Sequence, residues 1–236
     1  MIVTAHQPNY LPYLGFIEKI SCSEIYAIMD SVKFSRRGEA FQNRNRIKTE
    51  KGPVWLTIPV LHQEMQRICD VQIDNKQDWS RKHWYSILHA YTKSPYFDSY
   101  KDFFQNIYSK NWDKLVDLNE SIIRYLLKEF KVSVEIVKVS ELQLDAHGTD
   151  LIVGICKALG ADTYLSGKNG IRYIDISKAN DAGISVRFQE FRHPVYTQQH
   201  EHLGFMPKLS CIDLLFNCGQ NSMKIIRDAN MHMDPS

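Results

Sequence analysis

The sequence lacks the features that mark disulfide-stabilised, cysteine-zinc and membrane-spanning proteins. Its 236 residues include five cysteines, an odd number without CxxC spacing, which argues against a disulfide scaffold and a cysteine-based zinc site. No stretch offers the ~18 consecutive apolar residues that a membrane-spanning helix needs, and no basic start followed by a long apolar run resembles a signal peptide. We therefore expect reduced thiols, a cytoplasmic location and no transmembrane segment.

A strong net charge of either sign is also missing. Lysine and arginine number 29 against 27 aspartates and glutamates, a net charge of +2, which gives no broad field to hold a polyanion by counterion release. Bulk nucleic acid is therefore a poor candidate partner. A small phosphorylated ligand stays open, because it needs only a local cluster of Arg, Lys or backbone N–H groups.

The order of strand and helix signals predicts an α/β fold. Residues 2–5 are β-prone, and Pro8 and Pro12 prevent a regular helix before Tyr13. Helical spacing of apolar residues follows, and then the apolar run at residues 25–29. Such a β-loop-α-β opening usually forms parallel strands with a right-handed crossover.

Further signals extend this fold over the whole chain. Short strands are expected at residues 134–139, 163–165 and 184–188, whereas residues 75–132 predict three aromatic-rich helices. The length, with 44% hydrophobic residues, suits a single domain over residues 1–236. We expect a largely parallel, Rossmann-like central sheet on which residues 75–132 form a helical insertion or cap.

The loop that follows the first predicted strand is rich in polar groups. His6, Gln7, Asn9 and Tyr10 would lie at the carboxyl end of that strand, and Gly15 permits close backbone approach at the helix start. One interpretation is an anion site, in which first-turn N–H groups and the His6 imidazole face a phosphate. The alternative is a rigid structural turn.

A second motif alternates amide and guanidinium side chains. If this segment is extended, Gln42, Arg44 and Arg46 share one face, and Asn43 and Asn45 point to the other. Two arginines on one face would form a clamp suited to bidentate recognition of phosphate or carboxylate. The alternative is a solvent-facing strand with ordinary ion pairs.

A third motif runs from Ser166 to Arg172 between a short strand and an expected helix near residue 173. Gly167 and Gly170 would let successive N–H groups form an anion-binding nest, to which Lys168 and Arg172 add charge. The spacing of a Walker loop is absent. A simple turn is the alternative.

Other residues are candidates for acid–base or polar roles. His193 could exchange protons near neutral pH, and Asp213 could orient a base, bind a sugar hydroxyl or only cap a helix. His200-Glu201-His202 has no evident third ligand, so a solvated loop is favoured and no metal is predicted.

Together these segments resemble the WbqC-like protein family. The resemblance covers nearly the whole chain except the aromatic middle, and the agreement of several motifs in one order makes it specific. Its blocks are residues 6–16; residues 28–30 with Val32, Phe34 and Arg36; residues 42–47; residues 164–167 with Gly170 and Tyr173; and residues 193–196 and 209–219.

The resemblance implies an enzyme of bacterial surface-polysaccharide, or O-antigen, biosynthesis. It implies transfer of an acyl or aminoacyl group, such as glycyl, to a nucleotide-linked amino sugar. On this hypothesis Arg44, Arg46, Lys168 and Arg172 hold phosphates, and His6 or His193 removes a proton from the attacking amine. ATP or another nucleotide is a candidate cofactor, because an aminoacyl adenylate is one possible donor.

Two alternative functions stay open. The loops after the first strand and at residues 166–172 are similar in placement to the nucleotide-binding signatures of HIGH-type nucleotidyltransferases, so activation of a sugar phosphate is one alternative. The chain departs from that pattern at Phe16, where those enzymes carry a second histidine. The other alternative is a non-catalytic binding module of a glycan-assembly complex.

Overall fold

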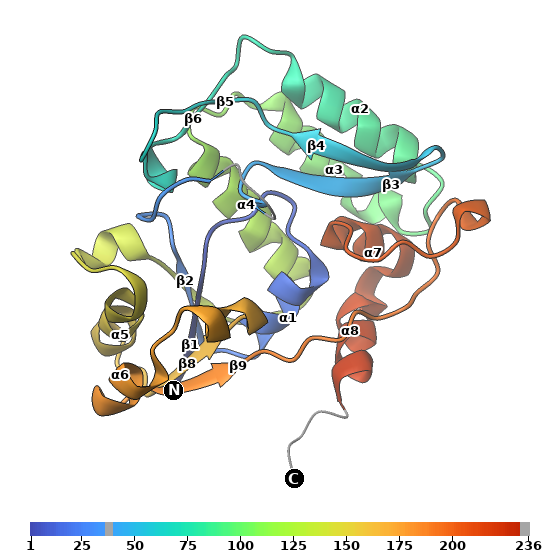
Figure 1. Cartoon of the computed structure of the whole chain (residues 1–236). Coiled ribbons are helices and arrows are strands. Elements are labelled where there is room, and N and C mark those ends of the chain that lie inside the picture. Colours follow the sequence, from blue (N-terminus) through green and yellow to red (C-terminus); the bar gives the residue numbers. More distant parts are fainter. Residues whose placement is uncertain (36–39, 232–236) are drawn as a thin grey trace.

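An all-parallel, five-stranded sheet lies at the centre of the computed structural model, which describes residues 1–35 and 40–231 (Figure 1). Arg36, which belongs to the family resemblance, lies outside the described residues. The strand order is β7-β2-β1-β8-β9, which confirms the predicted α/β, Rossmann-like fold. Its strands are β1 (Ile2–His6), β2 (Ile25–Ile28), β7 (Glu135–Lys138), β8 (Thr163–Ser166) and β9 (Ser185–Phe188).

The strand order reverses direction beside β1. The chain first winds outward from β1 to β2 and then to β7, and it returns to place β8 on the opposite side of β1. Open α/β sheets bind ligands outside the carboxyl ends of strands at such a reversal. The topology therefore points to the ends of β1 and β8 before any side chain is considered.

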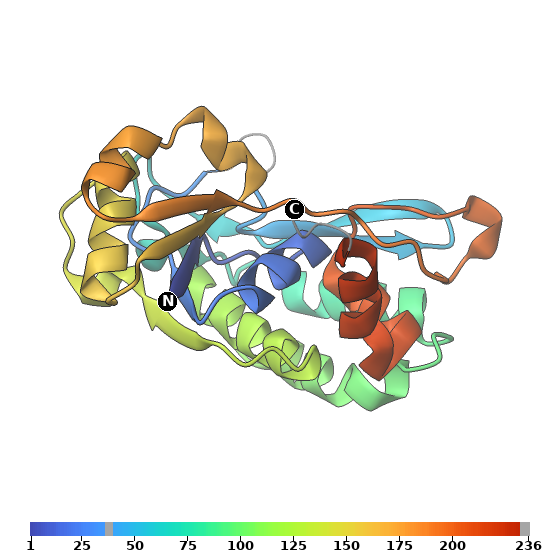
Figure 2. The ribbon, with the colours of Figure 1, turned by 90° about the horizontal axis from the view of Figure 1, so that it is seen from below.

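Helices cover both faces of the sheet, so every residue of β2 is buried. Tyr26 and Ile28 belong to one apolar core, and Ile25 and Ala27 belong to the other. Figures 1 and 2 both place α5 and α6 at one end of the molecule and α7 and α8 at the other. The α-helices are α1 (Leu14–Ser21), α2 (Trp79–Tyr91), α3 (Phe97–Ser109), α4 (Leu115–Glu129), α5 (Gly148–Ala158), α6 (Ile176–Asp181), α7 (Cys211–Cys218) and α8 (Ser222–Asn230).

Two small antiparallel ladders and several 3-10 turns complete the described residues. The ladders pair β3 (Arg44–Thr49) with β4 (Gly52–Thr57), and β5 (Val60–Leu61) with β6 (Gln72–Ile73). The three helices predicted within residues 75–132 are α2, α3 and α4, and their role as an insertion or cap stays a prediction. None of the helices in the described residues combines the length and apolar character needed to cross a bilayer. The 3-10 turns are η1 (Ile68–Asp70), η2 (Val139–Leu142), η3 (Lys168–Arg172), η4 (Glu201–Leu203) and η5 (Gly219–Asn221).

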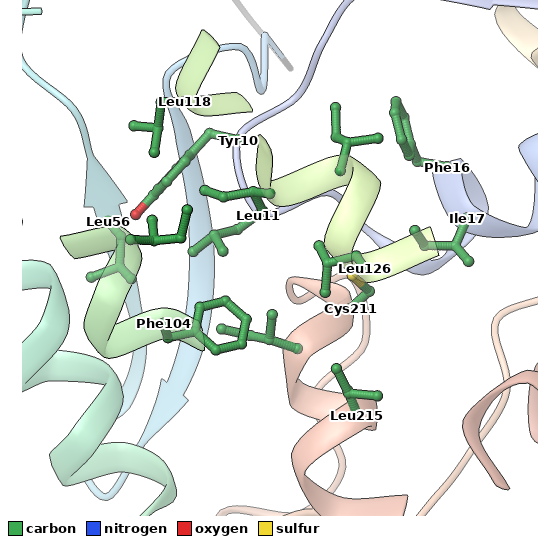
Figure 3. Packing of buried hydrophobic residues seen from close by; sticks show 14 of the residues in the cluster. Tyr10, Leu11, Phe16, Ile17, Leu56, Phe104, Leu118, Leu126, Cys211 and Leu215 are labelled. Atoms are coloured by element: carbon green, nitrogen blue, oxygen red, sulfur yellow. The ribbon is translucent and has the colours of Figure 1, made fainter. Parts of the chain in front are cut away.

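The larger core joins α1 to the three aromatic helices and the C-terminal helices. Figure 3 shows Phe16 and Ile17 of α1 in the same packed cluster as Phe104 of α3, Leu126 of α4 and Leu215 of α7. All of these side chains are fully buried. Helix α1, which follows the polar loop, is therefore held by apolar contacts that come from distant parts of the sequence.

Replacing Phe104 with alanine should strongly destabilise the fold. Its ring is fully buried and lies against the rings of Phe103, Tyr125 and Phe216, so Phe104→Ala should lower the free energy of unfolding by about 3–5 kcal/mol. Val195→Ala, at a side chain that is 77% exposed, should change it by less than about 0.5 kcal/mol. Urea denaturation measures both; equal losses would contradict the packing.

Candidate functional site

A cleft of about 450 Å³ lies at the carboxyl ends of β1 and β8, where the sheet order reverses. Its walls come from the end of β1 and the following loop, from α1, from the end of β2, from the start of α5, and from the segment that joins β8 to η3. This volume falls in the range of small-molecule sites. The location matches the place where open α/β sheets bind ligands.

The cleft brings together two of the segments that the sequence singled out. His6 and Gln7 follow β1, Ser166 ends β8 and Lys168 begins η3, and all four residues line the same cleft. The first pair, His6 and Gln7, is at least 159 positions away from Ser166 and Lys168 along the chain. Parallel strands β1 and β8 pair directly, so their carboxyl ends place these residues side by side.

His6 is held in a defined neutral form. Its Nδ1 lies 2.9 Å from the carbonyl oxygen of Gln7, and only a protonated Nδ1 can donate to that oxygen. Its ring meets Phe16 edge-on, with the ring centres 5.1 Å apart. Burial, together with the charge of Lys19, lowers the pKa of His6 to about 3. At neutral pH His6 is therefore uncharged, and Nε2 carries the lone pair.

Lys19 is a residue of the cleft that the sequence did not reveal. It belongs to α1 and is only 3% exposed, and its Nζ donates to the carbonyl oxygen of Ala5 at 3.2 Å. Burial lowers the pKa of Lys19 to about 7. The only sequence signal was its position between the apolar residues Ile17 and Ile20, where a lysine is usually expected at the solvent edge of a helix.

The cleft has a positive character. Lys19 and Lys168 line it together with His6 and His147, and no aspartate or glutamate occurs among the described residues that line it. The first turn of α5 also borders the cleft through His147 and Gly148. A helix N-terminus carries unpaired N–H groups and a partial positive charge. Such surroundings favour an anionic ligand.

In the segment between β8 and α6, Gly170 supplies space rather than a left-handed backbone, whereas a Cβ at Gly167 would meet no atom within 4 Å. The segment forms η3, and neither Gly167 nor Gly170 is among the glycines with positive φ. A Cβ at Gly170 would lie 2.0 Å from Ser166 Oγ. The expected helix begins at Ile176 rather than near residue 173, and Arg172 does not line the cleft.

The other polar candidates of the opening motif do not line the cleft. Asn9 and Tyr10 are buried, and the Tyr10 hydroxyl hydrogen-bonds His83 Nδ1 at 2.8 Å and the hydroxyl of Tyr108. A Cβ at Gly15 would lie 3.0 Å from side-chain atoms of Tyr13 and Phe191. Gly15 is therefore required for close packing.

The amides of the second motif bind the backbone of distant loops. Asn43 Nδ2 donates to the carbonyl oxygen of Ile58 at 2.9 Å, and Asn45 Nδ2 donates to that of Leu11 at 2.5 Å. Gln42 Nε2 donates to Gln7 Oε1 at 2.6 Å. Gln42 therefore does not share a ligand-binding face with the arginines; it orients Gln7, which lines the cleft.

Arg44 and Arg46 lie outside the cleft lining. Their guanidinium groups are 4.8 Å and 5.4 Å from the ring centre of Trp55 on β4, so they share one face of the hairpin. Arg46 Nη2 also donates to the carbonyl oxygen of Lys208 at 3.2 Å. The structure thus gives both arginines partners other than the cleft.

His193 is separated from His6 and has both ring nitrogens engaged. Nδ1 lies 2.8 Å from the carbonyl oxygen of Pro194, and Nε2 accepts from the backbone N–H of Lys208 at 3.1 Å. His193 does not line the cleft, and burial lowers its pKa. These contacts fix the C-terminal segment. No group of three or more potential metal ligands occurs in residues 1–35 and 40–231.

Asp213 stands at the centre of a buried network away from the cleft. Its carboxylate accepts from the hydroxyls of Tyr91 and Tyr196 and from Gln198 Nε2, each at 2.9 Å. Burial raises the pKa of Asp213, and these hydrogen bonds oppose the shift. The network joins α2, the segment after β9 and α7.

Asp213→Ala should destabilise the protein without a direct effect on the cleft. Three buried donors would each lose a hydrogen bond to the carboxylate, so the free energy of unfolding should fall by on the order of 3 kcal/mol. Urea denaturation measures the loss, and Asp228→Ala, at an exposed ion pair with Lys224, should cost less than about 1 kcal/mol. Similar losses in the two variants would contradict the network.

Lys19→Met should raise stability at neutral pH, because the substitution removes a buried charge. The gain should be on the order of 1–4 kcal/mol at pH 7. Lysine binds its proton up to about pH 10.4 in the unfolded chain and up to about pH 7 in the folded protein, so the wild type gains stability as pH rises through this window. The difference in free energy of unfolding between Lys19→Met and the wild type should therefore shrink between pH 7 and about pH 10. Urea denaturation at several pH values measures this difference, and a constant difference would contradict the prediction.

Comparison with known proteins found a matching family and a related protein. The model of the WbqC-like protein family matches residues 7–225. The chain is also 28% identical over 226 residues to the uncharacterized protein Rv1507c of Mycobacterium tuberculosis, covering 94% of this chain and 95% of that protein. The matched region includes every residue of the cleft named above except Ala5 and His6.

Proposed function

The chain belongs to the WbqC-like protein family, and we propose that it transfers an acyl or aminoacyl group, such as glycyl, to a nucleotide-linked amino sugar. The product would enter bacterial surface polysaccharide, such as O-antigen. One observation carries this proposal: His6 and Gln7 meet the Ser166–Lys168 segment in a single cleft at the sheet reversal. Such a position suits a nucleotide-linked substrate.

The lining of the cleft supports the substrate class. Its lysines and the start of α5 offer donors, and the described lining residues include no carboxylate. A nucleotide-linked sugar carries a pyrophosphate, which such donors recognise. Arg44 and Arg46 on β3 are not part of the proposed phosphate site, because both guanidinium groups lie over Trp55.

His6 is the residue placed to take the proton in this reaction. The sugar amine forms a C–N bond with the activated carbonyl carbon, the amine proton passes to His6 Nε2, and the leaving group of the donor departs with the bonding electron pair. Burial, together with the charge of Lys19, lowers the pKa of His6. An anionic substrate would offset that charge and raise the pKa of His6 toward the range of an effective base.

His6→Gln should lower the transfer rate by about 10²–10⁴-fold, because it removes the proton acceptor. Affinity for the nucleotide sugar should change only a few-fold. Mass spectrometry of purified protein with nucleotide-linked amino sugars, ATP and amino acids or acyl thioesters would detect the added acyl mass. His89→Gln, at an exposed histidine on α2, is the matched control and should keep the wild-type rate.

Other outcomes of the same assay distinguish the alternatives. Loss of transfer in His193→Gln with full activity in His6→Gln would overturn the assignment of the base. Pyrophosphate release from ATP or CTP with a sugar phosphate, without acyl transfer, would identify a nucleotidyltransferase. The second imidazole of that mechanism is replaced by Phe16, whose buried ring packs on His6, so this alternative is less well supported.

A further inference from the structure

Lys19 has no charged partner that explains its burial. Its side chain is 3% exposed and lines the cleft. Within the described residues, its ammonium has one hydrogen bond, to the carbonyl oxygen of Ala5, and no carboxylate lies within ion-pair distance. Buried lysines are rare unless paired, because removing an ammonium from water is costly.

A purely structural role does not account for this lysine. One hydrogen bond to a neutral carbonyl at 3.2 Å offsets only a small part of the desolvation cost of an ammonium group. On α1, Lys19 lies between the buried, apolar Ile17 and Ile20, with the partly buried Glu18 beside it. A residue such as methionine would continue this apolar surface without that cost, so the charge itself requires an explanation.

In the described residues, the other positive groups around the cleft also lack a negatively charged partner. The start of α5 borders the cleft at Gly148, where a side chain would meet no atom within 4 Å, and His147 provides no side-chain cap for the helix. Lys168 lines another wall and is exposed. Three positive features thus surround one space, and an anion is the ligand that would satisfy them together.

We propose that Lys19 is the buried counter-charge for a phosphate group, which the cleft holds between the Lys19 ammonium and the N-terminus of α5. The ligand class is a pyrophosphate-containing molecule, such as a nucleoside diphosphate or its sugar ester. This inference rests on the proposed function only in placing the substrate in the same cleft. It does not depend on which group is transferred.

Proton uptake is a direct consequence of this arrangement. Burial lowers the pKa of Lys19 to about 7, so a bound anion that raises this pKa draws a proton from solution at pH 7. The charged and titratable groups around Lys19 are Glu18 beside it on α1, His6 on β1, and, elsewhere in the cleft lining, His147, Lys168, Tyr13, Tyr164 and Tyr173. The Glu18 carboxylate accepts from Gln189 Nε2.

The test is isothermal titration of the purified full chain with inorganic pyrophosphate and with ADP at pH 7. We expect Lys19→Met to weaken binding of both ligands at least ten-fold. Repeating the titration in buffers of different ionisation enthalpy should show uptake of up to about half a proton in the wild type. Lys157→Met, at an exposed lysine near the other end of α5, is the matched control and should keep the affinity and the proton uptake.

Three results would overturn the proposal. They are wild-type affinity in Lys19→Met, no binding of pyrophosphate or ADP to the wild type, and the same proton uptake in Lys19→Met as in the wild type. A second measurement needs no variant: NMR titration of lysine side chains in the wild type should show one buried ammonium whose pKa rises when pyrophosphate binds. An unchanged pKa would also contradict the proposal.

The two proposals can fail separately. Lysine-dependent binding of pyrophosphate without any acyl transfer would leave the phosphate site intact and refute the proposed reaction. Acyl transfer that persists at the wild-type rate and KM in Lys19→Met would support the reaction and refute the phosphate role of Lys19.

Discussion

The structure depends on satisfying the buried backbone of the irregular loop between β1 and α1. This loop cannot form helix or sheet hydrogen bonds across Pro8 and Pro12, and buried carbonyl oxygens must find other partners. Asn119 on α4 donates to the carbonyl oxygen of Pro8 at 3.0 Å, and Asn45 on β3 donates to that of Leu11. Amide side chains from distant elements therefore fix the loop.

This bracing fixes the position of α1, the helix that carries Lys19. The braced loop ends at Tyr13, where α1 begins, and Gly15 lets the side chains of Tyr13 and Phe191 pack closely on the helix. Apolar contacts of Phe16 and Ile17 then fix the orientation of the helix in the larger core. Lys19 is consequently held beneath the carboxyl end of β1, where its ammonium meets the carbonyl oxygen of Ala5.

The described residues that line the cleft include two lysines and no aspartate or glutamate. Burial lowers the pKa of both Lys19 and His6, and the charge of Lys19 also lowers the pKa of His6. Protein interiors screen charges less than water does, so the ammonium of Lys19 acts on the protonation of His6. A negatively charged ligand would raise the pKa of both Lys19 and His6. Binding of the ligand would thereby be linked to the ability of His6 to accept a proton.

The sequence by itself determined the α/β class, the parallel sheet and two of the regions that form the cleft, because proline positions, apolar periodicity and glycines act over short stretches of chain. It also determined the kinship with the WbqC-like family, through motifs preserved in order. It did not determine the role of each polar residue. Asn43, Asn45 and Asp213 have the same chemistry whether they bind a ligand or a buried backbone and side-chain network.

Only the tertiary structure decided these roles, because they depend on partners far away in the sequence. Gln42 meets Gln7 across 35 positions, and Asn119 meets Pro8 across 111. Lys19 is buried because β1 and the larger core enclose one end of α1, which no local pattern specifies. The physical reason is that side-chain direction and burial are set by packing between elements, whereas the sequence directly encodes only the preferences within them.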